Sequence, residues 1–357
     1  LGLATPTALM VGSGLGAEKG ILIRSGEAIQ TMKDIKIIAF DKTGTLTRGR
    51  PRVTDVLAMN GFSEEELLAG AAGVESASEH PLGAALVEEA AARSIVPGEV
   101  QEFSSLTGLG VEGRIGDQAV LVGSNRLMDM QEIVSSGAEK MLDRLEEEGK
   151  TAVLTAIDGR LAGIIAVADT IKEEAVQAIA ELKEMGFQTA MITGDNPVTA
   201  RAIARHIGID EVLAGILPEG KVREVERLQR EYGLTAMVGD GINDAPALKQ
   251  ANVGIAIGTG TDIAIEAADI TLVRGDLGGV VSAIKLSRAT FKKIRQNYFW
   301  AWFYNGIAIP AAFFGLLHPI IGAGAMALSS FNVVLNSLRL KKVSLEPRYR
   351  QAEHGEE

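Results

Sequence analysis

Cysteine is absent from this sequence of 357 residues. The chain can therefore form no disulfide and no thiolate metal site of its own, and a reducing, cytoplasmic setting for its soluble part is compatible with that absence. Positive charge is in deficit, with 35 Lys and Arg against 46 Asp and Glu, a net charge of -11. Because a surface that binds nucleic acid needs clustered cations, this balance argues against a nucleic-acid partner.

A starting methionine and a basic leader are also missing, since the chain opens on LGLATPTALMVGSG. No secretory signal peptide is therefore expected, and the chain is interpreted as a piece of a longer protein. Its 46% hydrophobic and 23% charged residues fit an ordered protein, and its length allows two or more domains.

Two uncharged apolar stretches, 297–317 and 319–338, each have about the 20 residues that span a bilayer. Basic residues precede the first stretch at 292–295 and follow the second at 339–342. This flanking charge predicts a transmembrane hairpin with both outer ends in the cytoplasm and a short turn at His318 and Pro319 outside. The alternative is a pair of buried core helices.

Strand-like and helix-like segments alternate before the hairpin, as in a parallel α/β sheet. Nearly continuous apolar runs predict strands buried on both faces at 35–40, 187–193, 234–239 and 252–257. Amphipathic segments between them predict helices that end at Gly186 and Gly233. The pattern indicates a doubly wound α/β domain.

Residues 52–165 interrupt this series with an acidic helical segment and then short strands, which predicts an inserted α+β domain. The first domain is therefore expected to be discontinuous, with residues 30–51 and 166–284. The remaining predicted parts are the end of a membrane helix with a stalk at 1–29, the two-helix transmembrane hairpin at 285–340 and a cytoplasmic tail at 341–357.

Polar clusters follow three of the predicted parallel strands, at 41–43, 193–195 and 239–244. The carboxyl ends of parallel strands meet at one edge, where ligands bind. Asp41, Asp240 and Asp244 would repel one another there, and a hard cation such as Mg²⁺ would neutralise them. Lys221, at a predicted helix start after Pro-Glu-Gly, adds a positive charge that can face a phosphate.

A carboxylate in such a place can act as a nucleophile and form an aspartyl-phosphate. Mg²⁺ and Lys221 would stabilise the charge of the transferred group, while the Thr193 hydroxyl and backbone amides would hold its oxygens. A single Asp of this kind could instead be a helix cap or a turn residue. Three clusters at three strand ends favour the site.

The motifs DKTGTLT, MITGDN, PEGK and VGDGINDAPAL resemble, in this order, those of the P-type ion-pumping ATPases, whose phosphorylation domain has the haloacid-dehalogenase-like fold. The resemblance covers essentially the whole chain. It implies that Asp41 is phosphorylated and that Asp240, with Asp41 and the Thr43 carbonyl, holds Mg²⁺. The candidate catalytic residues are Asp41, Lys42, Thr43, Thr193, Gly194, Asp195, Lys221, Asp240, Asn243 and Asp244.

Residues 78–82, SEHPL, resemble a motif of the nucleotide domain in heavy-metal-transporting P-type ATPases. This resemblance implies that the insert is a nucleotide-binding domain in which His80, Glu75, Gly108 and Gly110 contact ATP. The GN pair of the family appears as GSN, so Gly123 and Asn125 are added as candidates. The alternative for the histidine is a structural role at a helix start. The GxGxxG match at 108–113 lacks a preceding strand and a following helix, which argues against a dinucleotide site.

Polar groups inside the predicted hairpin are candidates for an ion path. Tyr304 and Asn305 lie in the first stretch, and Met326 and Ser330 lie one helical turn apart in the second. A thioether suits a soft ion such as Cu(I), although helix packing alone is the alternative. YN followed by MxxSS resembles the copper branch of the heavy-metal pumps, in which a Cys-Pro-Cys motif precedes LGLATPTA.

The resemblance implies ATP-driven copper(I) export by an integral protein of the cell membrane, with its catalytic domains in the cytoplasm. The implied partners are ATP, Mg²⁺, Cu⁺, the lipid bilayer, the actuator domain and earlier membrane helices of the pump, and a copper-delivering protein. Silver is an alternative ion. A soluble phosphohydrolase of the same superfamily is the alternative enzyme, but it usually has a second Asp where Thr43 stands. A regulatory fragment that binds nucleotide without turnover is a third possibility.

Overall fold

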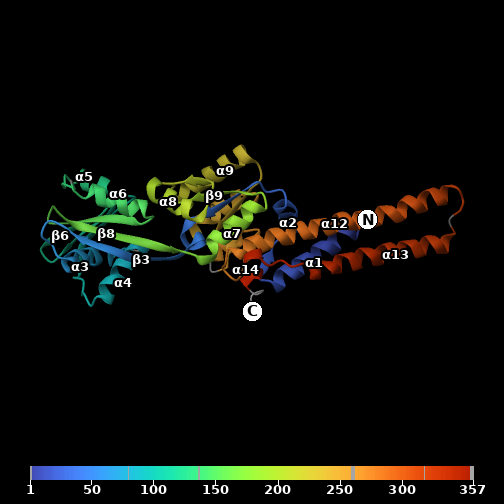
Figure 1. Cartoon of the computed structure of the whole chain (residues 1–357), viewed down its shortest axis with the longest axis horizontal. Coiled ribbons are helices and arrows are strands. Elements are labelled where there is room, and N and C mark those ends of the chain that lie inside the picture. The colour runs from blue at the N-terminus through green and yellow to red at the C-terminus, as the bar shows by residue number, and fades with distance from the viewer. Residues whose placement is uncertain (1, 79, 136, 259–261, 317, 354–357) are drawn as a thin grey trace.

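The protein consists of two β-sheets with their covering helices and a helical arm (Figure 1). The computed structural model describes residues 2–78, 80–135, 137–258, 262–316 and 318–353. A six-stranded sheet lies at one end of the elongated molecule and a seven-stranded sheet lies in the middle (Figure 1). The arm extends from the seven-stranded sheet to the other end.

The seven-stranded sheet has the order β1-β13-β12-β11-β2-β9-β10, and every neighbouring pair is parallel except β1 and β13. Its strands are β1 (Ile21–Ile23), β2 (Ile37–Asp41), β9 (Gln188–Ile192), β10 (Glu211–Leu213), β11 (Thr235–Gly239), β12 (Val253–Ile257) and β13 (Ile270–Leu272). The four predicted strands and the α/β fold class are confirmed. Strand β1, however, comes from the segment that was expected to be a membrane helix and stalk.

Both faces of this sheet are covered by helices, which is why its strands are continuously apolar. In β2, Ile38 and Phe40 point to one core and Ile37 and Ala39 to the other. The first core is closed by α2 (Gly26–Met32), α7 (Glu173–Glu184), α8 (Pro197–Ile207) and α12 (Gly278–Phe313). The second is closed by α9 (Lys221–Tyr232), α10 (Ala245–Gln250) and α11 (Asp262–Ala267).

The six-stranded sheet is antiparallel throughout, in the order β3-β8-β7-β6-β5-β4. Its strands are β3 (Thr47–Ala58), β4 (Val100–Leu106), β5 (Gly110–Ile115), β6 (Gln118–Gly123), β7 (Thr151–Ile157) and β8 (Arg160–Ile171). Helices α3 (Glu64–Glu75) and α4 (Pro81–Ala92) cover one face, and α5 (Asn125–Met130) and α6 (Glu139–Glu147) cover the other.

Strands β3 and β8 pair side by side and lead from one sheet to the other (Figure 1). The expected domain boundaries, at residues 52 and 165, fall inside these two strands. Those boundaries remain a prediction.

The helical arm consists of α1 (Ala4–Glu18), the outer part of α12, and α13 (Pro319–Leu338). Helices α12 and α13 run side by side to the far end of the molecule, where the chain turns back (Figure 1). Of the helices in the described residues, one segment, Ile320–Lys342, is long and apolar enough to cross a membrane. Only 17% of its most apolar window is buried, so it is not a core helix.

Two membrane spans were expected, and only the second of them is long and apolar enough to cross a membrane within the described residues. The other expected span, 297–317, forms the end of α12, which stops at Phe313, and Leu317 lies outside the described residues. Asparagine, tyrosine and tryptophan in this stretch lower its hydropathy.

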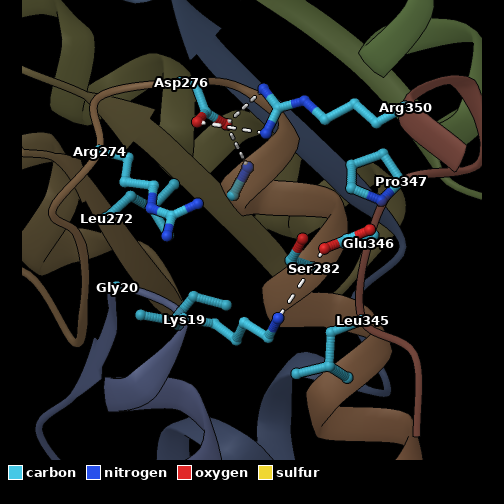
Figure 2. Close-up of a pocket in the computed structure, with 12 residues that line it drawn as sticks. Lys19, Gly20, Leu272, Arg274, Asp276, Ser282, Leu345, Glu346, Pro347 and Arg350 are labelled. Carbon is cyan, nitrogen blue, oxygen red and sulfur yellow. Dashed lines mark hydrogen bonds and ion pairs between the residues drawn. The ribbon is translucent and has the colours of Figure 1, made fainter. Parts of the chain in front are cut away.

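After α13 the chain returns to the start of α12, and α14 (Arg348–Glu353) is the last described element. This return borders a small cavity of about 200 Å³. Figure 2 shows the residues that line it. The Arg350 guanidinium lies 3.2 Å from Asp276, and Leu345 is buried. The tail is thereby held against the seven-stranded sheet.

Candidate active site

The candidate site lies at the carboxyl ends of three adjacent strands. Strand β2 is paired with β9 on one side and with β11 on the other. Asp41, the last residue of β2, is opposite Ile192, so Thr193 follows directly beside it. The carboxylates of Asp41, Asp240 and Asp244 each offer an oxygen, and these oxygens all lie within 4.8 Å of one another. The structure thus brings together the three acids that the sequence analysis grouped.

The loop after β2 is shaped by Gly44, which has a φ of 75°. A Cβ atom on this glycine would lie 1.8 Å from Oδ2 of Asp240. No side chain fits in that space, and the positive φ independently favours glycine. Gly44 therefore allows the DKTGT loop to lie directly against Asp240.

Lys221 bridges two of the acids from the first turn of α9. Its Nζ donates to Oδ1 of Asp41 at 2.5 Å and to Oδ1 of Asp244 at 2.6 Å. All three side chains are nearly inaccessible to solvent. The lysine thus neutralises part of the charge that the acids would otherwise concentrate.

The negative charge that Lys221 does not neutralise is unfavourable in this buried site, and it shifts the pKa values of the acids. Burial and the neighbouring charge of Asp244 raise the pKa of Asp41 to about 7, although Lys221 opposes this shift. Burial and Asp244 also raise the pKa of Asp240 to about 6. Because three convergent carboxylates are the oxygen donors that a hard divalent cation prefers, the residues present fit a Mg²⁺ ion.

The other predicted catalytic residues surround this centre. Thr193 is buried, and its Oγ1 accepts a hydrogen bond from the backbone N–H of Asp195 at 3.1 Å. The Asp195 carboxylate lies 2.9 Å from the ammonium group of Lys42, so this lysine is held by the next strand end. A Cβ on Gly194 would lie 3.6 Å from the Ile216 carbonyl oxygen, an ordinary contact, and Thr43 and Asn243 are exposed. The catalytic roles of these residues remain predictions.

Two residues that the sequence analysis missed, Asp169 and Lys172, contact the loop after β2 and the start of β3, next to the candidate site. Lys172 Nζ donates to the Gly44 carbonyl at 2.7 Å, and burial lowers the pKa of Lys172. Asp169 accepts hydrogen bonds from the Thr47 hydroxyl and from two backbone N–H groups of β3. In the sequence they could have been found in the segment ADTIK, where polar residues interrupt the apolar run of β8 before α7 begins.

The predicted nucleotide residues lie on the six-stranded sheet and its helices. His80 caps α4, and its Nδ1 accepts a hydrogen bond from the Leu82 N–H at 3.2 Å. Burial and the charge of Lys42 lower the pKa of His80. Glu75, at the end of α3, is buried, and burial raises its pKa. Residue 79 of the SEHPL motif lies outside the described residues.

The glycines of this region have structural explanations of their own. Gly110 and Gly123 are paired across β5 and β6, and a Cβ on Gly110 would lie 2.1 Å from the Val122 carbonyl oxygen. Gly108 lies in the turn between β4 and β5 with a φ of 73°. Asn125 is exposed at the first position of α5. The roles of these four residues in nucleotide binding therefore remain predictions.

In the arm, the candidate ion-path residues are only partly brought together. Tyr304 accepts a hydrogen bond from Asn332 at 2.8 Å, which ties α12 to α13. Asn305 donates within its own helix to the Ala301 carbonyl. Met326 and Ser330 are exposed, with 71% of Met326 accessible. Asn332 was not singled out from the sequence, although it lies in the same apolar stretch.

Comparison with known proteins places this geometry in a family. The family model described as haloacid dehalogenase-like hydrolase matches residues 35–252. The chain therefore belongs to the haloacid dehalogenase-like hydrolases, as its doubly wound sheet and terminal aspartate indicate. This confirms the predicted fold of the domain that carries Asp41.

Within that class, the chain is similar to metal-transporting P-type ATPases. It is 50% identical, over 96% of its length and 43% of the relative, to the copper-exporting P-type ATPase of Bacillus subtilis. It is 51% identical, over 98% of its length and 45% of the relative, to a probable copper-exporting P-type ATPase V of Mycobacterium tuberculosis. The predicted resemblance to the copper branch is confirmed, and the chain spans less than half the length of these relatives.

Solved structures agree with this grouping. The crystal structure of a zinc-transporting PIB-type ATPase superposes with a TM-score of 0.76 at 39% identity, over 95% of this chain and 55% of that one. A catalytic domain of the CPx-ATPase CopB-B matches with a TM-score of 0.60 at 29% identity, over 76% of this chain and 98% of that one.

Proposed function

We propose that this chain is the catalytic part of an ATP-driven copper(I) exporter, and that Asp41 accepts the terminal phosphoryl group of ATP. The observation that carries the proposal is the cluster at the end of β2, where Asp41, Asp240 and Asp244 converge around the ammonium group of Lys221. The similarity to copper-exporting P-type ATPases supports the choice of ion.

The proposed reaction is a phosphoryl transfer to a carboxylate. An Oδ of Asp41 attacks the terminal phosphorus of ATP, and a new O–P bond forms. The bond from that phosphorus to the bridging oxygen breaks, and the oxygen keeps the electron pair as ADP leaves. Lys221 holds the negative charge beside Asp41, and the Thr193 hydroxyl and nearby amides orient the phosphoryl oxygens.

Asp41, Asp240 and the Thr43 carbonyl are proposed to hold a Mg²⁺ ion. When bound, the ion neutralises the charge that the carboxylates and the phosphoryl group share. The raised pKa values of Asp41 and Asp240 support this assignment, because a buried carboxylate with a raised pKa is one whose charge is poorly compensated.

The aspartyl-phosphate is proposed to be long-lived, as a pump requires. A phosphohydrolase of this superfamily would use an acid two residues after the nucleophile, and that position is Thr43. A threonine hydroxyl cannot serve as the general acid and base that activate a water molecule near neutral pH. The absence of an acidic side chain at this position favours the pump over the phosphohydrolase.

The six-stranded sheet and its helices are proposed to bind ATP, through His80, Glu75, Gly108, Gly110, Gly123 and Asn125. The influence of the Lys42 charge on the pKa of His80 supports this, because it links one nucleotide candidate to the loop that carries Asp41. The predicted domain boundaries are retained, with residues 52–165 as the nucleotide-binding domain.

The arm is proposed to lie in the cell membrane, with the two sheets in the cytoplasm. Tyr304, Asn305, Met326 and Ser330 are proposed to line the path of Cu⁺, with silver as the alternative ion. The exposure of Met326 and Ser330 supports a path formed together with earlier membrane helices of a larger pump. The actuator domain and a copper-delivering protein are the further proposed partners.

The nucleophile is tested by incubating the full-length protein with ATP labelled in its terminal phosphate. The wild type is expected to form an acid-stable phosphoprotein, and Asp41→Asn is expected to form none, because an amide oxygen is a far weaker nucleophile than a carboxylate. Asp129→Asn, an exposed aspartate on α5, is the matched control and should retain the label. Label retained by Asp41→Asn would refute the assignment.

A further inference from the structure

A second cleft lies where the helical arm joins the seven-stranded sheet. It has a volume of about 870 Å³ and is formed mainly by α12, with contributions from the ends of α2 and α13. The residues that line it are Lys33, Arg288, Phe291, Lys292, Lys293, Arg295, Gln296, Phe299, Trp300, Asn336 and Arg339. Six of these side chains are basic and none is acidic.

Half of this positive charge has no protein partner. Within the described part of the chain, Lys292, Arg295 and Arg339 make no ion pair and no side-chain hydrogen bond. Lys33, in contrast, pairs with Asp34, and Arg288 donates to the Met185 carbonyl. The sequence separates Arg339 from the other basic residues by the whole hairpin, and the fold returns it to them.

Lys293, a half-buried cation of the cleft, lies near other positive charges. Lys293 Nζ donates to Gln296 at 3.2 Å and to Asn336 at 3.4 Å, but meets no carboxylate within the described residues. Burial and the charges of Arg339 and Lys292 lower the pKa of Lys293. An anion in the cleft would relieve this repulsion.

The cleft also has an apolar wall on the side that faces the outer part of the arm. Phe299 and Trp300 lie one turn beyond the basic residues of α12 and are 62% and 37% exposed. Helix α13 ends at Leu338, directly before Arg339. Basic residues next to exposed aromatic rings at the end of a membrane helix are typical of the depth of lipid headgroups.

We propose that this cleft binds the phosphate headgroup of an anionic phospholipid of the cytoplasmic leaflet. Lys292, Arg295 and Arg339 hold the phosphate, while the first part of an acyl chain lies against Phe299 and Trp300. The inference rests on the proposed membrane location of the arm. The apolar wall favours a lipid over free phosphate, since a soluble ion would use only the basic side.

The test uses the two tryptophans of the chain, Trp300 and Trp302. The Trp302→Phe variant of this chain, in which Trp300 is the one tryptophan, is placed in phosphatidylcholine bilayers that contain phosphatidylglycerol, with brominated acyl chains on one lipid or the other at equal mole fraction. Trp300 fluorescence is expected to be quenched more by brominated phosphatidylglycerol. Removing two basic residues with Arg295→Gln and Arg339→Gln should lower this preference roughly tenfold or more, since each contributes to anionic lipid binding.

Lys140→Gln with Arg205→Gln removes the same charge from exposed sites on α6 and α8, and should leave the preference unchanged. Equal quenching by both lipids, no quenching by either, or loss of the preference in excess inorganic phosphate would overturn the proposal. Phosphoprotein formation from ATP is measured in the same samples. Phosphorylation without lipid preference refutes only the lipid site, and lipid preference without phosphorylation refutes only the proposed reaction.

Discussion

Gly44 shows how one backbone position sets the geometry of the proposed phosphorylation site. Its positive φ and its contact with Asp240 both require the absence of a side chain. Gly44→Ala is expected to displace Asp240 and to raise the Mg²⁺ concentration needed for phosphorylation, in addition to a backbone cost of about 1 kcal/mol. The measurement is phosphoprotein formation as a function of Mg²⁺ concentration.

Gly61→Ala is the matched control for this change. Gly61 also has a positive φ, but a Cβ there would meet no atom within 4 Å. The control carries the same backbone cost without a collision, so its Mg²⁺ dependence should equal that of the wild type. Equal effects of the two substitutions would show that backbone strain, and not the position of Asp240, is responsible.

His80 gives a prediction about pH. The hydrogen bond from Leu82 requires a neutral Nδ1, and the pKa of His80 lies below its usual 6.5. Because a lowered pKa delays protonation on acidification, ATP affinity is expected to be constant from pH 8 to about 6.5 and to fall only at lower pH. Calorimetric titration with ATP across this range measures it.

In His80→Gln, the same titration should give a weaker affinity that no longer falls on acidification, whereas His206→Gln, an exposed residue of α8, should behave as the wild type. A decline in wild-type affinity with a midpoint above pH 6.5 would contradict the role given to His80.

At the scale of elements, the connection between the sheets depends on Asp169. This side chain fastens the start of β3 to the end of β8 through hydrogen bonds to Thr47, Gly49 and Arg50. Asp169→Ala is expected to slow phosphorylation from ATP about tenfold, which corresponds to about 1.4 kcal/mol, because the hydrogen bonds that hold β3 to β8 are lost. Rapid-quench measurement of phosphoprotein formation is the assay.

Phosphorylation by inorganic phosphate should change much less, because it does not need the six-stranded sheet, which is proposed to bind the nucleotide. Asp117→Ala, an exposed residue in the turn between β5 and β6, is the control. Equal losses with ATP and with phosphate would place Asp169 in the phosphorylation site and not in the connection.

Helix α13 carries the prediction about the ion. Met326 is exposed, so Met326→Ala should leave the melting temperature nearly unchanged, yet lower copper(I)-stimulated ATP hydrolysis several-fold because a thioether ligand is lost. Leu328→Ala, also exposed on α13, removes a similar apolar surface without sulfur. Unchanged copper dependence in Met326→Ala would remove this residue from the path.

The strands that end at the site could be predicted from the sequence because each is a short apolar run that stops at a polar cluster. Asp169 and Lys172 were missed because β8 is a long strand of the other sheet, and only the fold brings its end to Gly44. Strand β1 was missed because three apolar residues after a helix give no periodic signal.

At the scale of the whole molecule, the candidate catalytic residues and the candidate nucleotide-binding residues come from two different sheets and their helices. The three acids and Lys221 belong to the domain of the seven-stranded sheet, whereas the nucleotide candidates belong to the domain of the six-stranded sheet, and the charge of Lys42 affects the pKa of His80 across them. Hydrophobic patterns in the sequence predict the strands and helices of each domain, but they carry no information about which residues of the two domains lie near one another. The basic cleft at the root of the arm was likewise visible in the sequence only as two separate charged flanks.

The central claim is that the phosphoryl group is attached to the carboxylate at the end of β2. Full-length protein phosphorylated by ATP can be reduced with tritiated borohydride, which converts an acyl-phosphate to an alcohol. Peptide analysis is predicted to find tritium in homoserine at position 41. Tritium at another acidic residue, or phosphate on a serine or threonine with none at position 41, would contradict the account.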